Sequence, residues 1–339
     1  MNTLDGLDLG ALARFFAENV PGFRGELHAE LVQGGRSHLT YRLTGGQGSW
    51  VLRRPPLGGL TPSAHDVARE YRVVSALADS GVPVARAVAL GDAQVMGVPF
   101  ALVEYVDGVV IRTEAQLEPW PDQLVADCAH ALMDVLARLH AVEPASVGLD
   151  GFGRSEGYLA RQVARRHDQW QRVRTRDLPD VETLHAVLAQ VCPPECGASV
   201  VHGDFRIGNA IPTHDDPSRI RALVDWEMAT LGDPLADLGL HLVYADPAFA
   251  PVLAGRAAST SPRLPAPADL AERYATASGR SLENLGYYIA LGYLKIAVIA
   301  EGIHARHRQG LTLGSGFETV GDAPAPLAAA GLRALRRNP

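Results

Sequence analysis

The chain has 339 residues, a length typical of about two domains. Hydrophobic residues make up 47% and charged residues 20% of the chain, as in ordinary folded proteins, so a collagen-like or low-complexity protein is excluded. The formal net charge of −7 argues against a nucleic-acid partner, and three cysteines cannot close a disulfide framework, which favours the reducing cytoplasm.

The first part of the chain predicts a unit built from helices and an antiparallel sheet. Residues 1–12 lack the basic start of a signal peptide, and apolar residues recur at helical spacing from residue 12 to residue 20. Short extended runs broken by glycines over residues 26–54 predict antiparallel hairpins. Two further strands are expected over residues 86–90 and 100–106.

One helix is expected within this first part of the chain. It would start near Ser63, with Val67, Tyr71, Val74, Leu77 and Ala78 on its inner face. Beyond Asp107, helical patterns dominate. The longest helical stripe beyond Asp107 covers residues 122–142, and the most apolar stretch, 287–300, is too short to span a bilayer comfortably. We therefore expect no membrane partner and two lobes, a nucleotide-binding lobe over residues 1–106 and a helical catalytic lobe over residues 107–339.

Two apolar, β-prone runs each end in polar residues and indicate phosphoryl transfer. Residues 200–209 read VVHGDFRIGN and residues 223–227 read LVDWE. Phosphoryl transfer needs one carboxylate to accept the proton of the attacking hydroxyl, and Asp204 suits that role. It also needs hard oxygen ligands for Mg²⁺, which the amide oxygen of Asn209 and the carboxylate of Asp225 would supply.

This pattern resembles the aminoglycoside phosphotransferase family of kinase-like enzymes. The H-G-D loop and the V-D-W-E segment carry the resemblance, together with VLRRPPLG at residues 51–58 and AHDVAREY at residues 64–71. These last two are similar to a branch that also occurs fused to acyl-CoA dehydrogenases. The resemblance implies an α+β, bilobal, protein-kinase-like fold with an antiparallel sheet in the N-lobe and a mainly helical C-lobe. It makes Asp204 the catalytic base, Asn209 and Asp225 the metal ligands, and His202 a support of the loop.

The resemblance also implies the parts that would bind ATP. Gly34, Gly35 and Ser37 would form a shortened phosphate-binding loop. The strand WVLRR, residues 50–54, is similar to the strand that carries a phosphate-anchoring lysine, with arginine in its place. Strand alternation puts Val51 and Arg53 on one face and Arg54 on the other. We favour Arg53 as the anchor, with Val51 near the adenine, and Arg54 is the alternative.

Four further positions follow from the resemblance. Glu70 matches the helix acid that pairs with the anchor, although a solvent-facing helix residue is an equal alternative. The backbone of Glu104 and Val106, in the expected hinge strand, would bind the adenine. Asp237 matches the acid that holds the catalytic loop from a following helix. The chain departs from the family pattern at His38, where asparagine is common, and at Lys295, where arginine is more usual.

An arginine-rich stretch bears on the acceptor. Residues 154–176 hold seven arginines and two acids, a net charge of +5, and Arg161 and Arg165 share one helix face. The stretch is either a solvated surface helix or a wall of the acceptor site, where the family's helical insertion would place it. Aminoglycosides are polycations and would require acids there, so we expect an acceptor that carries negative charge, with Arg161 and Arg165 as its ligands.

The sequence thus predicts an ATP- and Mg²⁺-dependent phosphotransferase that acts on a hydroxyl of a small molecule, such as a hydroxy acid or a hydroxyacyl-CoA. The alternative is a pseudokinase, a nucleotide-binding or scaffolding protein without transfer activity, which the arginine at the anchor position favours. The sequence leaves open GTP as the donor and the oligomeric state.

Overall fold

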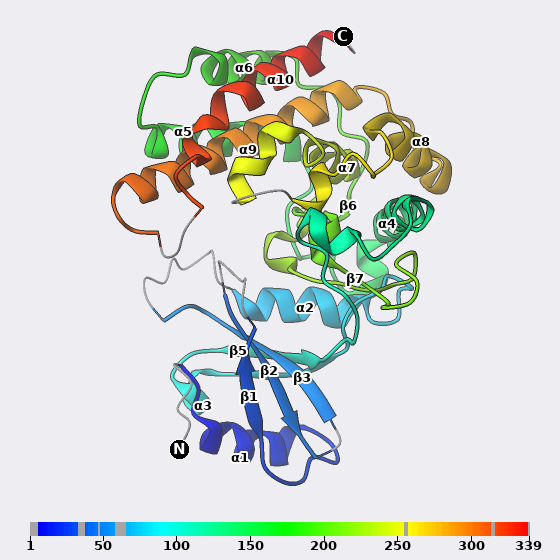
Figure 1. Ribbon diagram of the computed structural model, residues 1–339, viewed down its shortest axis with the longest axis vertical. Coiled ribbons are helices and arrows are strands. Elements are labelled where there is room, and N and C mark those ends of the chain that lie inside the picture. Colours follow the sequence, from blue (N-terminus) through cyan, green and yellow to red (C-terminus); the bar gives the residue numbers. More distant parts are fainter. Residues whose placement is uncertain are drawn as a thin grey trace. The chain divides into compact units, whose positions relative to one another are not determined.

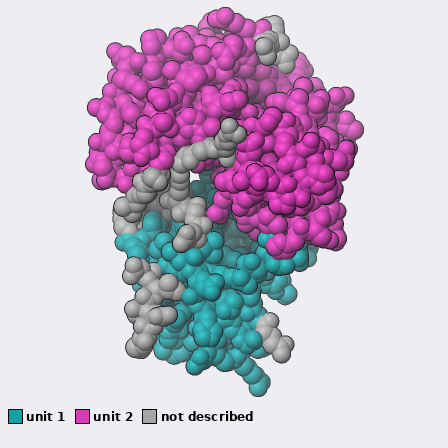
Figure 2. All heavy atoms as spheres, viewed as in Figure 1, with its two compact units in different colours: residues 1–108, 221–229 teal, residues 109–220, 230–339 magenta. Residues whose placement is uncertain are grey.

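The computed structural model describes residues 6–32, 38–46, 48–57, 66–253, 257–312 and 316–337. The chain divides into two compact units, which Figure 2 colours separately. Unit 1 comprises residues 1–108 and 221–229, and unit 2 comprises residues 109–220 and 230–339. The segment 221–229 therefore belongs to unit 1, so no single boundary along the sequence separates the two units.

Unit 1 is built on a five-stranded antiparallel sheet with the strand order β1-β2-β3-β5-β4. Its strands are β1 (His28–Leu31), β2 (Leu39–Gly45), β3 (Gly48–Arg54), β4 (Ala87–Gly91) and β5 (Phe100–Glu104). These are the strands expected from the sequence, except that β5 ends at Glu104. The backbone of Val106 therefore lies beyond the last strand residue.

Helix α1 (Leu9–Asn19) packs its apolar side on one face of this sheet (Figure 1). Asp8 caps the helix by accepting the N–H of Ala11 at 2.9 Å. Phe16 is fully buried against Trp50 of β3, with the two rings in an edge-on contact at 5.1 Å. Because side chains alternate along a strand, this core leaves Val51 and Arg53 on the opposite face.

Helix α2 (Val67–Leu77) packs against β4 and β5 and contributes a buried acid to unit 1. It begins after Asp66, whose carboxylate accepts the N–H of Arg69 at 3.0 Å, whereas the start expected near Ser63 lies outside the described residues. Val67, Val74 and Leu77 are buried as the apolar pattern predicted, whereas Tyr71 is only half-buried and Glu70 is buried with them. Glu70 can be buried on this face because Arg53 and His38 lie beside its carboxylate.

Hydrogen bonds to backbone carbonyls join the segment 221–229 to the rest of unit 1. The N–H of Leu223 donates to the carbonyl of Pro83 at 2.8 Å, and the guanidinium of Arg69 donates to the carbonyl of Ala229 at 3.1 Å. These contacts hold the segment beside α2 and the loop that follows it. They place Asp225 and Glu227 in the same unit as Arg53.

Unit 2 is mainly helical (Figure 1). Its helices are α4 (Asp122–Ala141), α5 (Tyr158–Val173), α6 (Pro179–Gln190), α7 (Pro234–Val243), α8 (Pro267–Ser278), α9 (Leu285–Arg308) and α10 (Pro324–Arg337). The short helix α3 (Ala93–Met96) belongs to unit 1. The short strands are β6 (Ser199–Val201), β7 (Ala210–Pro212) and β9 (Thr230–Gly232) in unit 2, and β8 (Ile220–Leu223), whose last three residues belong to unit 1. Strands β6 and β9 pair antiparallel.

Helix α9 is the central helix of unit 2. By length and composition alone it could cross a membrane, but 56% of its most apolar window is buried inside the protein. It packs against α5, α6, α7 and α10, and the core around it is apolar. Its apolar character is therefore explained by burial on several sides.

The crossing of α7 and α9 depends on glycine. A Cβ atom at Gly239 of α7 would lie 2.6 Å from the backbone carbon of Tyr288 in α9, closer than atoms can approach. Gly292 of α9 faces α7 in return, where a Cβ would lie 3.2 Å from the Cα of Leu240. This close approach sets the position of Asp237 on α7 and of Lys295 on α9.

We predict that Gly239→Ala lowers the free energy of unfolding by about 1–3 kcal/mol, because the added methyl group must push two packed backbones apart. The measurement is urea denaturation followed by circular dichroism. Gly302→Ala in α9 is the control, since a Cβ there would meet only Val173 side-chain atoms at 3.5 Å or more. That control should be neutral or stabilising by up to about 1 kcal/mol, and equal destabilisation by both changes would contradict the close approach.

Candidate active site

The arginine of β3 forms a buried ion-pair network in unit 1. Arg53 Nη1 lies 2.9 Å from Glu70 Oε2, and Arg53 Nη2 lies 2.9 Å from Asp225 Oδ1. Burial lowers the pKa of Arg53, but the charges of Glu70 and Asp225 outweigh burial and hold it above its usual value. Burial also raises the pKa of Glu70 to about 7, against the lowering effects of Arg53 and His38. Of the two alternatives for Glu70, the structure shows the ion pair with Arg53.

The neighbouring arginine has a different environment. Arg54 is 5% exposed on the core face of β3, and its guanidinium donates to the carbonyls of Gly6 and Pro55. It thus ties the start of the chain to the end of the strand. Arg53, which shares its face with the half-buried Val51, is the arginine that meets the acids of α2 and of the 221–229 segment.

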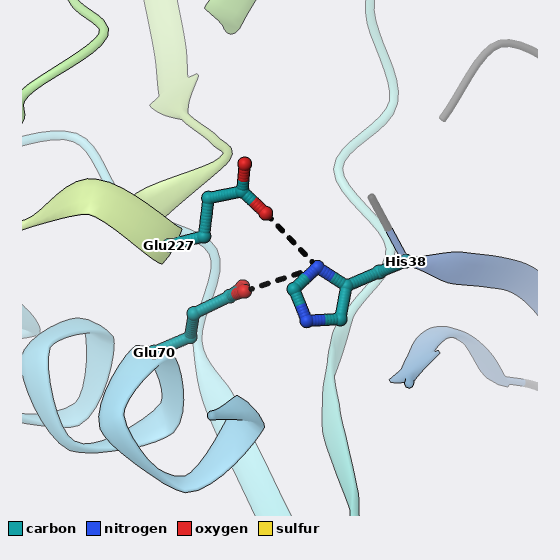
Figure 3. A group of neighbouring side chains, drawn as sticks. All are labelled: His38, Glu70 and Glu227. Carbon is teal, nitrogen blue, oxygen red and sulfur yellow. Dashed lines mark ion pairs between the residues drawn. The ribbon is translucent and has the colours of Figure 1, made fainter. Parts of the chain in front are cut away.

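A histidine lies beside Glu70 and one further carboxylate, that of Glu227, as Figure 3 shows. His38 Nδ1 is 3.1 Å from Glu227 Oε2 and 3.6 Å from Glu70 Oε1, and the imidazole is buried. These three side chains offer ligand atoms within 4.8 Å of one another, a spacing that a metal ion could use. Arg53 Nη2 lies 3.4 Å from the same His38 nitrogen, so a positive charge already occupies this cluster.

The backbone at Asp225 has an unusual conformation. Its φ of 69° and ψ of 57° lie in the left-handed region, which non-glycine residues rarely adopt. Aspartate tolerates this region better than most residues, and such strain is frequent at functional sites. The turn directs the carboxylate of Asp225 toward Arg53.

The other positions predicted to bind nucleotide give less information. Gly34, Gly35 and Ser37 lie outside the described residues. The Glu104 carboxylate is exposed and lies 3.5 Å from Arg86, and Glu104 donates its N–H to the Arg86 carbonyl at 2.8 Å. The binding of adenine by Glu104 and Val106 stays a prediction.

In unit 2, the loop after β6 presents the predicted base. Gly203 has a φ of 79°, a left-handed conformation that favours glycine and turns the chain toward Asp204. Asn209 Nδ2 donates to Asp204 Oδ2 at 2.8 Å, and Arg206 Nε lies 3.3 Å from the same oxygen. The hydroxyl of Tyr244 donates to Asp204 Oδ1. Donors therefore hold both oxygens of the carboxylate.

Asp237 braces this loop from the first turn of α7. Its carboxylate accepts the backbone N–H groups of His202, at 2.5 Å, and of Gly203, at 2.8 Å. Burial alone would raise the pKa of Asp237, but the hydrogen bond and charge of His140 and the charge of His202 lower it below its usual value. The ring of His202 accepts the N–H of Asp204 at 3.3 Å. Both residues thus support the loop through its backbone.

Two members of this constellation were not identified from the sequence. Tyr244 lies at the end of α7, far from any recognisable motif, and only the folded chain brings its hydroxyl to Asp204. Arg206 lies inside the loop motif, but nothing in the sequence indicated that its side chain would contact the carboxylate of Asp204. A buried phenol beside a carboxylate has no sequence signature, because partners distant in the chain define it.

The arginine-rich stretch is not a single cationic wall. Arg161 donates to the carbonyls of Arg154 and Glu156 at the start of α5. Arg174 lies 3.6 Å from Glu182, and Arg176 lies 3.2 Å from the buried Glu301. The binding of an acceptor by Arg161 and Arg165 stays a prediction.

Arg165 is exposed, whereas its neighbour Arg166 is 5% exposed. Much of the net charge of this segment is therefore neutralised locally or directed to solvent. Arg166 is the arginine that α5 carries into the interior of unit 2, although the helical-face argument did not select it.

A helical unit with a braced H-G-D loop, and a sheet unit with an Arg–Glu pair and a V-D-W-E aspartate, define a kinase-like phosphotransferase. Residues 28–274 match the model of the phosphotransferase enzyme family. The chain belongs to this family, whose members transfer phosphate to hydroxyl groups of small molecules.

Solved structures share the fold. A Ralstonia eutropha protein assigned to the aminoglycoside phosphotransferases is 30% identical, with a TM-score of 0.84 over 98% of this chain and 99% of that chain. An aminoglycoside phosphotransferase in complex with ADP and hygromycin B is 16% identical, with a TM-score of 0.62 over 97% of each chain, and shows the fold alone. The bilobal kinase-like fold expected from the sequence is confirmed.

Curated relatives are longer. Acyl-CoA dehydrogenase family member 11 of Gallus gallus is 34% identical over 342 residues, which cover 97% of this chain and 44% of the relative. The chain thus spans less than half the length of that relative. The expected resemblance to kinase-like domains fused to acyl-CoA dehydrogenases is confirmed.

We predict that Asp237→Asn lowers the free energy of unfolding by about 1–3 kcal/mol at neutral pH, because one amide oxygen cannot replace a carboxylate that accepts two backbone N–H groups. The pKa of Asp237 is depressed in the folded state, so its stabilising contribution is present above the usual value of 3.8 and is lost as the pH falls below it. The difference between wild type and variant in urea denaturation should therefore shrink on acidification. A difference independent of pH would contradict the ionised brace.

Proposed function

We propose that this protein transfers the terminal phosphoryl group of Mg²⁺-bound ATP to a hydroxyl of a small acceptor that carries negative charge. The observation that carries the proposal is the Asp204 carboxylate, held at both oxygens by donors on a loop that Asp237 braces. A base with this restraint can receive the proton of a hydroxyl without first reorganising.

The side chains fit a divalent cation. Asn209 uses its amide nitrogen to donate to Asp204, so its amide oxygen is the atom with which it would ligate a metal. In unit 1, three carboxylates face one guanidinium and one imidazole, an excess of negative charge that suits a cation. We propose Asn209 and Asp225 as the Mg²⁺ ligands. Bound Mg²⁺ would neutralise charge on the nucleotide phosphates.

The nucleotide assignment rests on Arg53. Its ion pair with Glu70 is the arrangement that kinases use to hold a phosphate-anchoring cation, and arginine can contact phosphate through two N–H groups. We propose ATP as the donor, in line with the ADP complex of the solved phosphotransferase. The paired state of Arg53 supports the enzyme over a pseudokinase, since the arginine retains the partner that an anchor needs.

The acceptor is proposed to be anionic. The relatives named acyl-CoA dehydrogenase family members suggest a hydroxy acid or a hydroxyacyl-CoA, and the arginines of α5 supply positive charge in the catalytic unit. We propose that the enzyme acts in the cytoplasm, as the low cysteine content suggests.

For the base, we predict that Asp204→Asn lowers kcat by about 10²–10⁴-fold, the usual effect of removing a general base. A panel of hydroxy acids, assayed for ATP consumption, identifies an acceptor for the measurement. Nucleotide affinity should be unchanged in Asp204→Asn, whereas Asp225→Asn should lose the Mg²⁺ dependence of nucleotide binding. Wild-type turnover by Asp204→Asn would exclude the proposed role, and the absence of transfer by the wild type to every hydroxyl tested would favour the pseudokinase.

For the anchor, we predict that Arg53→Gln weakens Mg·ATP binding in calorimetry by about tenfold or more, the loss expected for a charge-assisted bond to phosphate. Arg54→Gln is the matched control on the same strand. It should lower the thermal stability, because the carbonyls of Gly6 and Pro55 lose their donor, while the nucleotide affinity stays the same. The opposite pattern would make Arg54 the anchor.

A further inference from the structure

Three side chains of unit 1 converge from three separate segments (Figure 3). His38 stands directly before β2, Glu70 lies on α2, and Glu227 belongs to the 221–229 segment. His38 Nδ1 lies 3.1 Å from Glu227 Oε2 and 3.6 Å from Glu70 Oε1, and these three atoms all lie within 4.8 Å of one another. Among the described residues, no other three histidine, cysteine or acidic side chains bring their ligand atoms so close together.

The spacing of the three atoms matches that of ligands around a small dication. Zinc binds histidine nitrogen and carboxylate oxygen at about 2.0–2.2 Å, which places the ligand atoms of a tetrahedral site about 3.4 Å apart. The distances from His38 Nδ1 to the two glutamate oxygens, 3.1 and 3.6 Å, lie on either side of this value. A metal ion can therefore take one atom from each side chain without a large rearrangement.

One of these atoms has an unmet need for a partner. Glu70 is 5% exposed, and its Oε2 lies 2.9 Å from Arg53 Nη1. Its Oε1, on the side of the His38 ring in Figure 3, accepts no hydrogen bond from any of the described residues. A buried carboxylate oxygen without a donor is costly. The contact of Oε2 with Arg53 is also the kind of second contact that orients a metal-binding carboxylate.

Arg53 does not fill the place of such a metal. Both of its terminal nitrogens have carboxylate partners at 2.9 Å, Nη1 with Glu70 and Nη2 with Asp225, whereas Nη2 lies 3.4 Å from His38 Nδ1. Ionised Glu70, Asp225 and Glu227 carry three negative charges, and Arg53 compensates one of them. One dication compensates the other two. The Mg²⁺ proposed at Asp225 would arrive with the nucleotide, whose phosphates bring further negative charge.

The donor set selects the kind of metal. Mg²⁺ prefers oxygen ligands alone, whereas an imidazole nitrogen favours zinc and the neighbouring transition metals. One nitrogen and two carboxylate oxygens leave a fourth tetrahedral position for water. The side chain of Glu227 is 21% exposed, so solvent and ions can reach the group from its side.

We propose that His38, Glu70 and Glu227 form a binding site for a transition-metal dication such as Zn²⁺, with ligands other than those proposed for Mg²⁺. The bound ion joins the start of β2, helix α2 and the 221–229 segment, and so stabilises unit 1. It also fixes the orientation of Glu70, the partner of Arg53. The competing explanation is an imidazolium at His38 that pairs with the two glutamates and binds no metal.

Cobalt(II) tests the site through its ligands. Co²⁺ binds the same nitrogen and oxygen donors as Zn²⁺, and in a tetrahedral site it absorbs visible light far more strongly than octahedral Co²⁺ in water does. The full chain is titrated with Co²⁺ in excess Mg²⁺, which occupies sites made of oxygen alone. Binding by the exposed Cys192 or Cys196 would be recognised by a thiolate charge-transfer band in the near ultraviolet.

We expect one equivalent of Co²⁺ to bind saturably, with strong visible absorption and no thiolate band, and Zn²⁺ to displace it. His38→Asn and Glu227→Gln should each weaken this binding by about tenfold or more, because each removes a ligand. His28→Asn, which replaces an exposed histidine of β1, is the matched control and should bind as the wild type does. Asn209→Ala should also bind Co²⁺ normally, because Asn209 is a proposed ligand of Mg²⁺ alone.

Thermal unfolding gives a second measurement. Zn²⁺ should raise the midpoint of unfolding of the wild type and of His28→Asn, but not that of His38→Asn, because only a ligand that binds the folded state stabilises it. Circular dichroism checks that each variant is folded, and Glu227→Gln decides the question if His38→Asn does not fold.

Three results would overturn the site. The first is no saturable visible absorption with the wild type, which would leave His38 as a partner in ion pairs only. The second is wild-type binding by folded His38→Asn and Glu227→Gln, which would assign the metal to other ligands. The third is binding lost in Asn209→Ala, which would assign the metal to the proposed Mg²⁺ site. Since these experiments involve no phosphoryl transfer, each of these results leaves the proposed function intact.

Discussion

The catalytic unit depends on one buried carboxylate that accepts two consecutive backbone N–H groups. Asp237 receives the donors of His202 and Gly203, which a sharp turn with a left-handed glycine would otherwise leave unsatisfied in the interior. The bond fixes the direction in which the chain leaves β6, and with it the position of Asp204. Since Asp237 lies on α7, the close crossing of α7 and α9 at Gly239 is part of the same construction.

Charge is distributed differently in the two units. In unit 1, three carboxylates lie around Arg53 and His38, in line with the proposed metal site. In unit 2, donors hold both oxygens of Asp204, and Lys295 donates to the backbone carbonyl of Gly203.

The sequence alone identified the family, the two-lobed fold and the residues of the H-G-D and V-D-W-E segments. These follow from short-range patterns, because polar residues at a fixed spacing after an apolar strand can be recognised in the sequence. Strand alternation also separated Arg53 from Arg54 correctly by face, since side chains in a strand alternate whatever packs on them. Strand alternation could not decide which face of β3 meets Glu70 and Asp225. The helical pattern of residues 67–77 did not show that Glu70 lies on the buried side.

Tertiary structure decided the contacts between residues distant in the chain. Only folding brings Tyr244 to Asp204, Asp225 to Arg53, and Lys295 to the carbonyl of Gly203. It also distributed the arginines of residues 154–176, giving Arg161, Arg174 and Arg176 partners in the fold while Arg166 is buried without a carboxylate among the described residues. The physical reason is that an ion pair or a buried charge depends on distance in space and on the loss of water, and the order of residues encodes neither directly. The sequence by itself thus determined which chemistry the chain can carry, and the packing of α5, α7 and α9 determined which charges surround the base.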